Sequence, residues 1–264
     1  MAMPCNILDV LREGAERSAR RHSPSKMGRA LQSLVWRDSF INHAEFSIPV
    51  GSNQTLRVRQ VPNGEISGLG TGLTVWPAAC VLLKYLEHRY APSNGLQGKR
   101  VVELGCGTGA VGIAAAMLGA QVVLTDQAQI LFHIQANIHA NDVAGVKYCA
   151  YDWGAPLPDL IATGGPVDMV LISDCVLPKL YPIEPLVDAI CLLCASEPRT
   201  VVLVSFEHRF YERFDAKEMF WSVVAQRRLC IREIPVETHH PDYNADDIEI
   251  WEVSTSKPHS HHGL

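Results

Sequence analysis

Between residues 100 and 253, short runs rich in apolar and β-branched residues alternate with longer runs of helical periodicity. This alternation predicts an α/β fold, because a strand, a helix and a second strand in succession form a right-handed crossover between parallel strands. A loop alone separates the last two strand-like runs, so we expect an antiparallel hairpin at one edge of the sheet. The predicted strands cover 100–104, 121–125, 146–150, 167–173, 200–206, 229–236 and 247–253, and the predicted helices between them cover 109–118, 127–140, 183–196 and 216–228.

The residues before this region divide into two parts. Residues 1–43 are expected to form a partly flexible extension, since 11–29 are rich in Arg and Lys and show little apolar periodicity. From residue 44 onward, apolar positions alternate on both sides of a turn at 51–53, which predicts a β-hairpin, and Pro77 suits the first turn of a helix that runs to about 89. We therefore expect a single domain over 44–254, followed by a disordered His-rich tail over 255–264.

Charge and composition exclude several classes of function. The chain carries 23 basic and 28 acidic residues, so it has no overall positive field to attract nucleic acid. Its apolar stretches are much shorter than the roughly 18–20 residues that cross a bilayer. The eight cysteines lie mostly in apolar runs, as buried thiols do in a reducing compartment. We expect no nucleic-acid or membrane partner, a monomer, and a location in the cytoplasm, with the nucleus as a second compartment.

A glycine-rich turn follows the strand at 100–104, in the sequence E-L-G-C-G-T-G at 103–109. Gly105 and Gly107 let the backbone approach a ligand closely, and the helix that begins here offers free N–H groups. Asp126 ends the next strand, about 20 residues after Gly105, where a carboxylate can accept hydrogen bonds from both hydroxyls of a ribose. A ligand that contains a nucleoside is therefore expected.

The glycine turn by itself leaves the kind of nucleoside open. Gly105, Gly107 and Ala110 also satisfy the G-x-G-x-x-G/A pattern of dinucleotide-binding proteins, which would indicate an NAD-dependent oxidoreductase. Glu103 weighs against a dinucleotide, because its carboxylate would repel a pyrophosphate and attract a cationic group such as an ammonium. A third glycine at 109 and the reversed final hairpin favour the layout of a seven-stranded methyltransferase instead.

Together, these segments resemble the S-adenosylmethionine-dependent protein lysine methyltransferases of family 16. The resemblance covers about 44–253 and rests on the motifs at 103–109, 126, 135–141, 152–154 and 168–174, with the segment 72–79 upstream. It implies a seven-stranded Rossmann-like class I methyltransferase fold with an N-terminal β-hairpin. It also implies S-adenosylmethionine as cofactor and a lysine of an intracellular protein, such as a chaperone or a translation factor, as methyl acceptor.

Carried over position by position, the resemblance implies a set of cofactor-binding residues. Trp76 would border the cofactor, Asp126 would bind its ribose, and Trp153 would lie beside its adenine. An indole offers the adenine a flat apolar surface, and the neighbouring Asp152 could accept a hydrogen bond from the exocyclic amine. The full implied set is Trp76, Glu103, Gly105, Cys106, Gly107, Asp126, Trp153 and Ser173.

The chain departs from the family pattern at the acceptor side. Lysine-modifying relatives usually show an acidic residue, two spacers and then Tyr or Phe, whereas here Leu177 follows Asp174 at that distance. Tyr181 is a nearby substitute, or it is a surface loop residue. Asp174 remains the expected catalytic residue that holds the acceptor lysine, and Glu207, at the end of the next strand, is a second candidate for orienting the amine.

Two further hypotheses compete with protein lysine methylation. The same fold could methylate a small molecule, or the chain could bind the cofactor without turnover. Methyl transfer itself needs only alignment of the two reactants and a desolvated, neutral amine, so neither a metal nor a nucleophilic side chain is expected.

Overall fold

The computed structural model describes residues 43–62, 71–195, 197 and 199–255 of the 264 residues. The expected basic arm at 11–29 and most of the expected His-rich tail lie outside the described residues. Within the described residues, no helix is long and apolar enough to cross a membrane.

In the described part of the chain, seven strands form the central sheet, in the order β5-β4-β3-β6-β7-β9-β8. Neighbouring strands from β5 to β7 are parallel, and β9 is antiparallel to both β7 and β8. This confirms the predicted α/β sheet and its reversed final hairpin. The strands are β3 (Arg100–Leu104), β4 (Gln121–Asp126), β5 (Val146–Ala150), β6 (Met169–Ser173), β7 (Val201–Glu207), β8 (Cys230–Glu233) and β9 (Ile248–Ser254).

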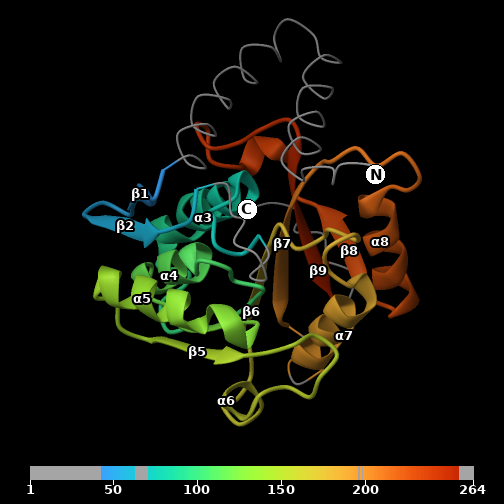
Figure 1. The fold of residues 1–264 in the computed structure, drawn as a ribbon, viewed down its shortest axis with the longest axis horizontal. Helices are drawn as coiled ribbons and strands as arrows, with labels where there is room; N and C mark the ends of the chain where they lie inside the picture. Colours follow the sequence, from blue (N-terminus) through green and yellow to red (C-terminus); the bar gives the residue numbers. More distant parts are fainter. Residues whose placement is uncertain (1–42, 63–70, 196, 198, 256–264) are drawn as a thin grey trace, which may run out of the picture.

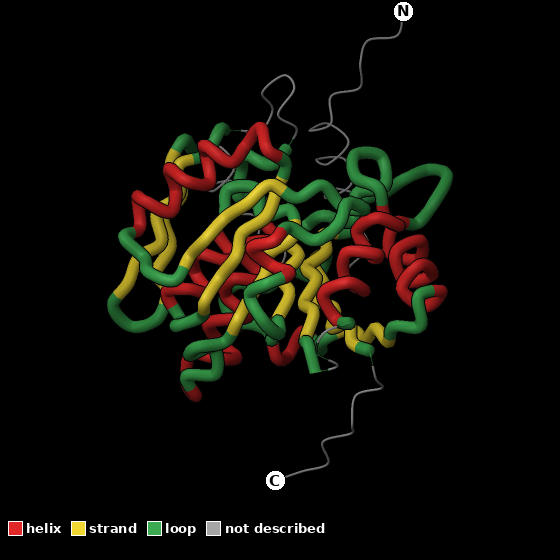
Figure 2. The backbone as a smooth tube through the Cα atoms, turned by 90° about the horizontal axis from the view of Figure 1, so that it is seen from below, coloured by secondary structure: helices red, strands yellow, loops and turns green. Residues whose placement is uncertain are grey.

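Helices cover both faces of the sheet, as Figures 1 and 2 show. One hydrophobic core joins α3, α4 and α5 to the sheet, and a second core joins α6, α7 and α8 to the opposite face. The central strands β3 and β6 are therefore buried except at one terminal residue each and are mostly apolar, as parallel strands between two helical layers are. The helices are α3 (Pro77–Tyr90), α4 (Ala110–Met117), α5 (Leu131–Asn141), α6 (Asp159–Ala162), α7 (Ile183–Cys194) and α8 (Ala216–Gln226).

The predicted N-terminal hairpin is present as β1 (Glu45–Val50) and β2 (Gln54–Arg59). Along β1, every second side chain is buried, which is the pattern of a strand with one face on a core. Side-chain amides of α5 attach β2 to the rest of the molecule. Asn141 bonds both the backbone N–H and the carbonyl of Arg57, at 2.8 Å and 2.6 Å, so that its amide substitutes for a neighbouring strand.

Asn137 makes the same kind of contact one helical turn earlier, and it also reaches the glycine turn. Its Oδ1 accepts a hydrogen bond from the N–H of Arg59 at 2.9 Å, and its Nδ2 donates to the carbonyl of Thr108 at 2.9 Å. The amide is fully buried. One side chain therefore connects the hairpin, α5 and the turn that follows β3.

Candidate active site

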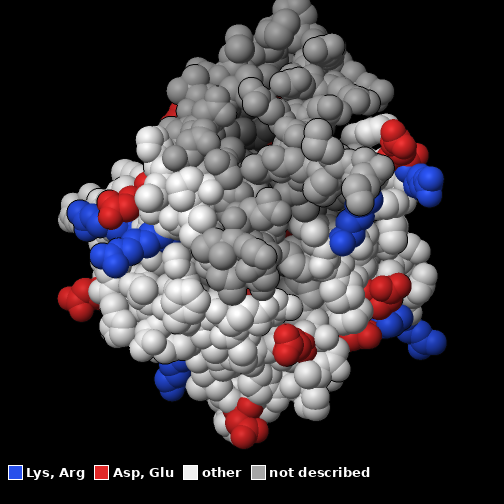
Figure 3. Space-filling view, viewed as in Figure 1, with Lys and Arg blue, Asp and Glu red and all other residues white. Residues whose placement is uncertain are grey.

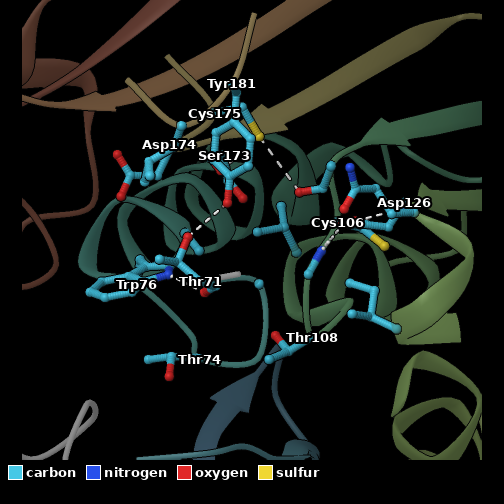
Figure 4. Close-up of a pocket in the computed structure, with 18 of the residues that line it drawn as sticks. Thr71, Thr74, Trp76, Cys106, Thr108, Asp126, Ser173, Asp174, Cys175 and Tyr181 are labelled. Carbon is cyan, nitrogen blue, oxygen red and sulfur yellow. Dashed lines mark hydrogen bonds between the residues drawn. The ribbon is translucent and has the colours of Figure 1, made fainter. Parts of the chain in front are cut away.

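A cavity of about 370 Å³ opens at the carboxyl ends of β3, β4 and β6, where the order of the strands reverses. This switch point is where α/β proteins bind ligands, and the volume lies within the range of small-molecule sites. Figure 4 shows the residues that surround it. Of the residues expected to bind the cofactor, those that line the cavity are Trp76, Gly105, Cys106, Gly107, Asp126, Trp153 and Ser173.

The glycine turn needs its glycines for steric reasons. Gly105 and Gly107 both have φ in the left-handed region, at 63° and 55°. A Cβ on Gly105 would lie 2.7 Å from Sγ of Cys175 and 2.9 Å from the indole of Trp153, and a Cβ on Gly107 would lie 2.5 Å from the carbonyl oxygen of Gly72. The turn is therefore packed against three other segments of the chain, and a side chain at either glycine would fill the cradle.

Asp126 fixes the turn from the end of β4. Its Oδ2 accepts a hydrogen bond from the N–H of Gly107 at 2.8 Å, and its Oδ1 accepts one from the N–H of Gln127 at 2.7 Å. Burial raises the pKa of the carboxyl, and the two N–H donors oppose that shift. Each carboxylate oxygen keeps a further lone pair for a ribose hydroxyl.

Glu103 does not line the cavity. It lies behind the glycine turn, fully buried, where its Oε2 accepts a hydrogen bond from the N–H of Gly112 at 2.8 Å. Its Oε1 has no partner among the described residues. Burial raises the pKa of Glu103 to about 8, so the group is mostly a neutral acid near pH 7. In this position, Glu103 does not reach the cavity, so the expected contact with a cationic ligand group is not supported.

Thr71 connects two sides of the cavity wall. Its carbonyl accepts a hydrogen bond from Nε1 of Trp76 at 2.8 Å, and its hydroxyl is 2.7 Å from that of Tyr181 in the loop after β6. The ring of Tyr181 also meets the ring of Trp153 edge to face, with centroids 6.0 Å apart. Tyr181 thus lies in the site and not on the outer surface, whereas Leu177, at the family's aromatic position, is buried.

Asp174 and Glu207 lie close together because both contact Arg209, a residue that the sequence did not predict as part of the site. Nη1 and Nη2 of Arg209 bond the two carboxylate oxygens of Asp174 at 2.7 Å and 2.5 Å, and Nη2 lies 3.3 Å from Glu207. The side chains of Arg209 and Asp174 are only 4% and 3% exposed. The expectation for Glu207 is therefore corrected, since it does not line the cavity, whereas Asp174 borders the cavity as predicted and its role toward the amine stays a prediction; both carboxylates pair with a buried guanidinium.

The charge of the cavity matches a cation better than a pyrophosphate. Asp126 and Asp152 line it, as does Asp174, whose carboxylate pairs with Arg209, and no Lys or Arg is among its lining residues in the described part of the chain. S-adenosylmethionine carries a positive sulfonium and an ammonium, whereas a dinucleotide carries two negative phosphates. The carboxylates, the glycine cradle and the two indoles of Trp76 and Trp153 thus fit the sulfonium cofactor.

Comparison with known proteins agrees with this site. A sequence model of the lysine methyltransferase family matches residues 53–227. Protein N-lysine methyltransferase METTL21A of Danio rerio is 35% identical over 219 residues, which cover 81% of this chain and 88% of the relative. EEF1A lysine methyltransferase 3 of Mus musculus is 42% identical over 122 residues, which cover 46% of this chain and 49% of the relative.

Among solved structures, the fold is similar to that of the 16S rRNA methyltransferase RsmC of T. Thermophilus in complex with AdoMet and guanosine. The TM-score is 0.50 at 16% sequence identity, over 80% of this chain and 50% of that chain. At this identity, the similarity extends to the fold alone. From the family match, the extent of the METTL21A alignment and the geometry of the cavity, we conclude that the chain belongs to the lysine methyltransferase family, whose cofactor is S-adenosylmethionine.

Proposed function

We propose that this protein transfers a methyl group from S-adenosylmethionine to the side-chain nitrogen of a lysine in a protein substrate. The observation that carries the proposal is the cavity at the switch point, which combines the glycine cradle with an acidic lining. The relatives METTL21A and EEF1A lysine methyltransferase 3, named for lysine methylation, support the choice of acceptor.

The cofactor supplies, when bound, a methyl group activated by a positive sulfur. The chain's own residues have to hold and align it. Asp126, at the end of β4, would accept hydrogen bonds from the ribose hydroxyls, and the N–H groups at the start of α4 would hold the carboxylate of the amino-acid part. Trp153 provides an apolar surface for the adenine.

The acceptor amine has to arrive neutral and in line with the sulfur–methyl bond. Removal from water lowers the pKa of an ammonium, and the largely apolar wall of the cavity around Tyr181 and Leu180 provides that environment. Burial raises the pKa of Tyr181 to about 12, so its hydroxyl stays protonated and can still accept a hydrogen bond from an amine. We assign to Tyr181 the place that the family's aromatic residue has at the position of Leu177.

The partners and location follow from the same proposal. We propose a translation factor or a chaperone as substrate, with elongation factor 1A tested first, since one relative is named for acting on it. We further propose that the protein works as a monomer in the cytoplasm and the nucleus and does not act on nucleic acid. On the face shown in Figure 3, the basic side chains of the described residues are interspersed with acidic ones and form no continuous basic patch.

The test is transfer of radiolabelled methyl from S-adenosylmethionine into proteins of a cell extract. We compare the wild type with Asp126→Ala and with a matched control, Asp159→Ala, whose exposed carboxylate does not line the cavity. The proposal expects a protease-sensitive, nuclease-resistant labelled band that disappears only with Asp126→Ala, and methyl-lysine in its hydrolysate.

Other outcomes would contradict the proposal in distinct ways. Label found only in small molecules would indicate a small-molecule methyltransferase. Cofactor binding without any transfer would indicate a binding module. Absence of S-adenosylmethionine binding would favour the alternative hypothesis of an NAD-dependent oxidoreductase.

A further inference from the structure

Asp174, the first residue after β6, has an unusual backbone conformation. Its φ is 57°, in the left-handed region that residues with a side chain rarely adopt, and its N–H donates to the carbonyl of Ser205 at 2.9 Å. Such a conformation costs about 1–3 kcal/mol and persists only where surrounding contacts impose it. The residues on either side of it, Ser173 and Cys175, both line the cavity, so the turn shapes the wall of the site.

The side chain of Asp174 forms a two-point pair with Arg209. The guanidinium binds Asp174 at two points and also donates to the carbonyl of Glu207 at 3.0 Å, which ties the ends of β6 and β7 together. Buried ion pairs add little net stability compared with apolar side chains of similar size, so fold stability alone is a weak reason for this one. Its position beside the cavity points to a role in the site.

We propose that Arg209 is a positioning residue that holds the Asp174 turn in place and compensates the negative charge of that carboxylate beside the methyl-transfer site. The proposal rests on the use of S-adenosylmethionine. Without Arg209, the carboxylate would attract the sulfonium and stabilise the cofactor before the reaction. It would also favour the ammonium form of the acceptor, which cannot attack the methyl group. With Arg209 in place, the positive sulfur stays reactive and a neutral amine is favoured.

The surrounding charges are consistent with compensation by Arg209. Asp174 and Glu207 lie within hydrogen-bond distance of the guanidinium, and Tyr211 is a further titratable neighbour. Burial lowers the pKa of Arg209, but the two carboxylates outweigh it and raise the pKa overall, so the guanidinium stays charged. The other two carboxylates that line the cavity, Asp126 and Asp152, are present in every variant, so the variants differ only in the charge at Arg209 or Asp174.

The test compares the binding of S-adenosylmethionine with that of S-adenosylhomocysteine, because the two compounds differ by one positive charge at the sulfur. Calorimetry on the full chain gives the ratio of the two affinities. Arg209→Gln removes the charge of the guanidinium and should shift the ratio toward S-adenosylmethionine by about fivefold or more. Arg209→Lys keeps the charge and should leave the ratio within about twofold of the wild type.

A second variant keeps the test decisive if Arg209→Gln does not fold. Asp174→Asn leaves the guanidinium less compensated and should shift the ratio in the opposite direction, toward S-adenosylhomocysteine. A role in structure alone would weaken both affinities together, so an unchanged ratio in both Arg209→Gln and Asp174→Asn would overturn the role of Arg209. Failure of the wild type to bind either compound would instead overturn the proposed function.

Discussion

Substitution of Gly107 by alanine would test the packing of the glycine turn most directly. The new Cβ would lie 2.5 Å from the carbonyl oxygen of Gly72, whereas ordinary contacts begin at 3.4 Å. One of the two backbone segments must therefore move by about 0.9 Å. The positive φ of 55° adds a conformational cost of about 1–2 kcal/mol for a residue with a Cβ.

The displaced segments are those that form the cofactor site. Gly107 donates its N–H to Asp126, and Gly72 lies between Thr71 and Trp76 in the opposite wall. Misplacement by about 1 Å reduces the rates of positioned reactions by about a hundredfold. We expect Gly107→Ala to bind S-adenosylmethionine at least about tenfold more weakly and to transfer methyl about a hundredfold more slowly.

Gly98→Ala is the matched control for this experiment. Gly98 also has a positive φ, of 70°, but a Cβ there meets no atom within 4 Å. It should lose the same 1–2 kcal/mol of unfolding free energy, measured by urea denaturation, and keep the cofactor affinity of the wild type. Equal cofactor affinities of Gly107→Ala and Gly98→Ala would refute the argument that the glycine is required by the contact with Gly72.

Three further predictions concern separate contacts. Asn137→Ala leaves the carbonyl of Thr108 without its amide donor, and we expect a loss of about 2–4 kcal/mol in a urea titration; a loss below about 1 kcal/mol would contradict the bridging role. Tyr181→Phe removes the hydrogen bond to Thr71 and should weaken cofactor binding up to about tenfold in calorimetry, with Thr71→Val giving the same effect and the double variant no more. Burial would raise the pKa of Glu249, but hydrogen bonds from three side chains lower it to about 2. The resulting stability, roughly 3 kcal/mol, should be complete above about pH 4.5 and disappear as the pH falls through about 2. In thermal unfolding, the melting temperature of Glu249→Gln should decrease less steeply at acidic pH than that of the wild type. An equally steep decrease would show that other groups cause it.

The sheet could be predicted from the sequence because each strand run is short, apolar and bounded by turns. The order of the seven strands and of the longer helices between them was correct, and strand β3 has the predicted bounds. Two details were missed for local reasons. Helix α6 is one turn of four residues, too short for an apolar period to show. Strand β8 ends at Glu233 and not at 236, since Pro235 has no N–H to continue a ladder.

The candidate site was accessible to sequence reasoning only where its residues lie in one motif. Gly105, Gly107 and Asp126 belong to a fixed spacing, and all three line the cavity. Arg209 and Tyr181 belong to loops after two different strands, and only the parallel pairing of β6 with β7 brings Arg209 to Asp174. An Arg two residues after a strand that ends in Glu was the available signal, but its pairing depends on tertiary structure.

The place of β9 in the sheet constrains how the protein can be made. Its residues 248–254 pair with β7 on one side and β8 on the other, so the seven-stranded sheet stays split until this strand exists. Trp251 on β9 is fully buried and packs against Phe206 and Phe220. During synthesis, β7 therefore has an unpaired edge and an incomplete core until residue 254 has been made, and such an edge is prone to pair with other chains.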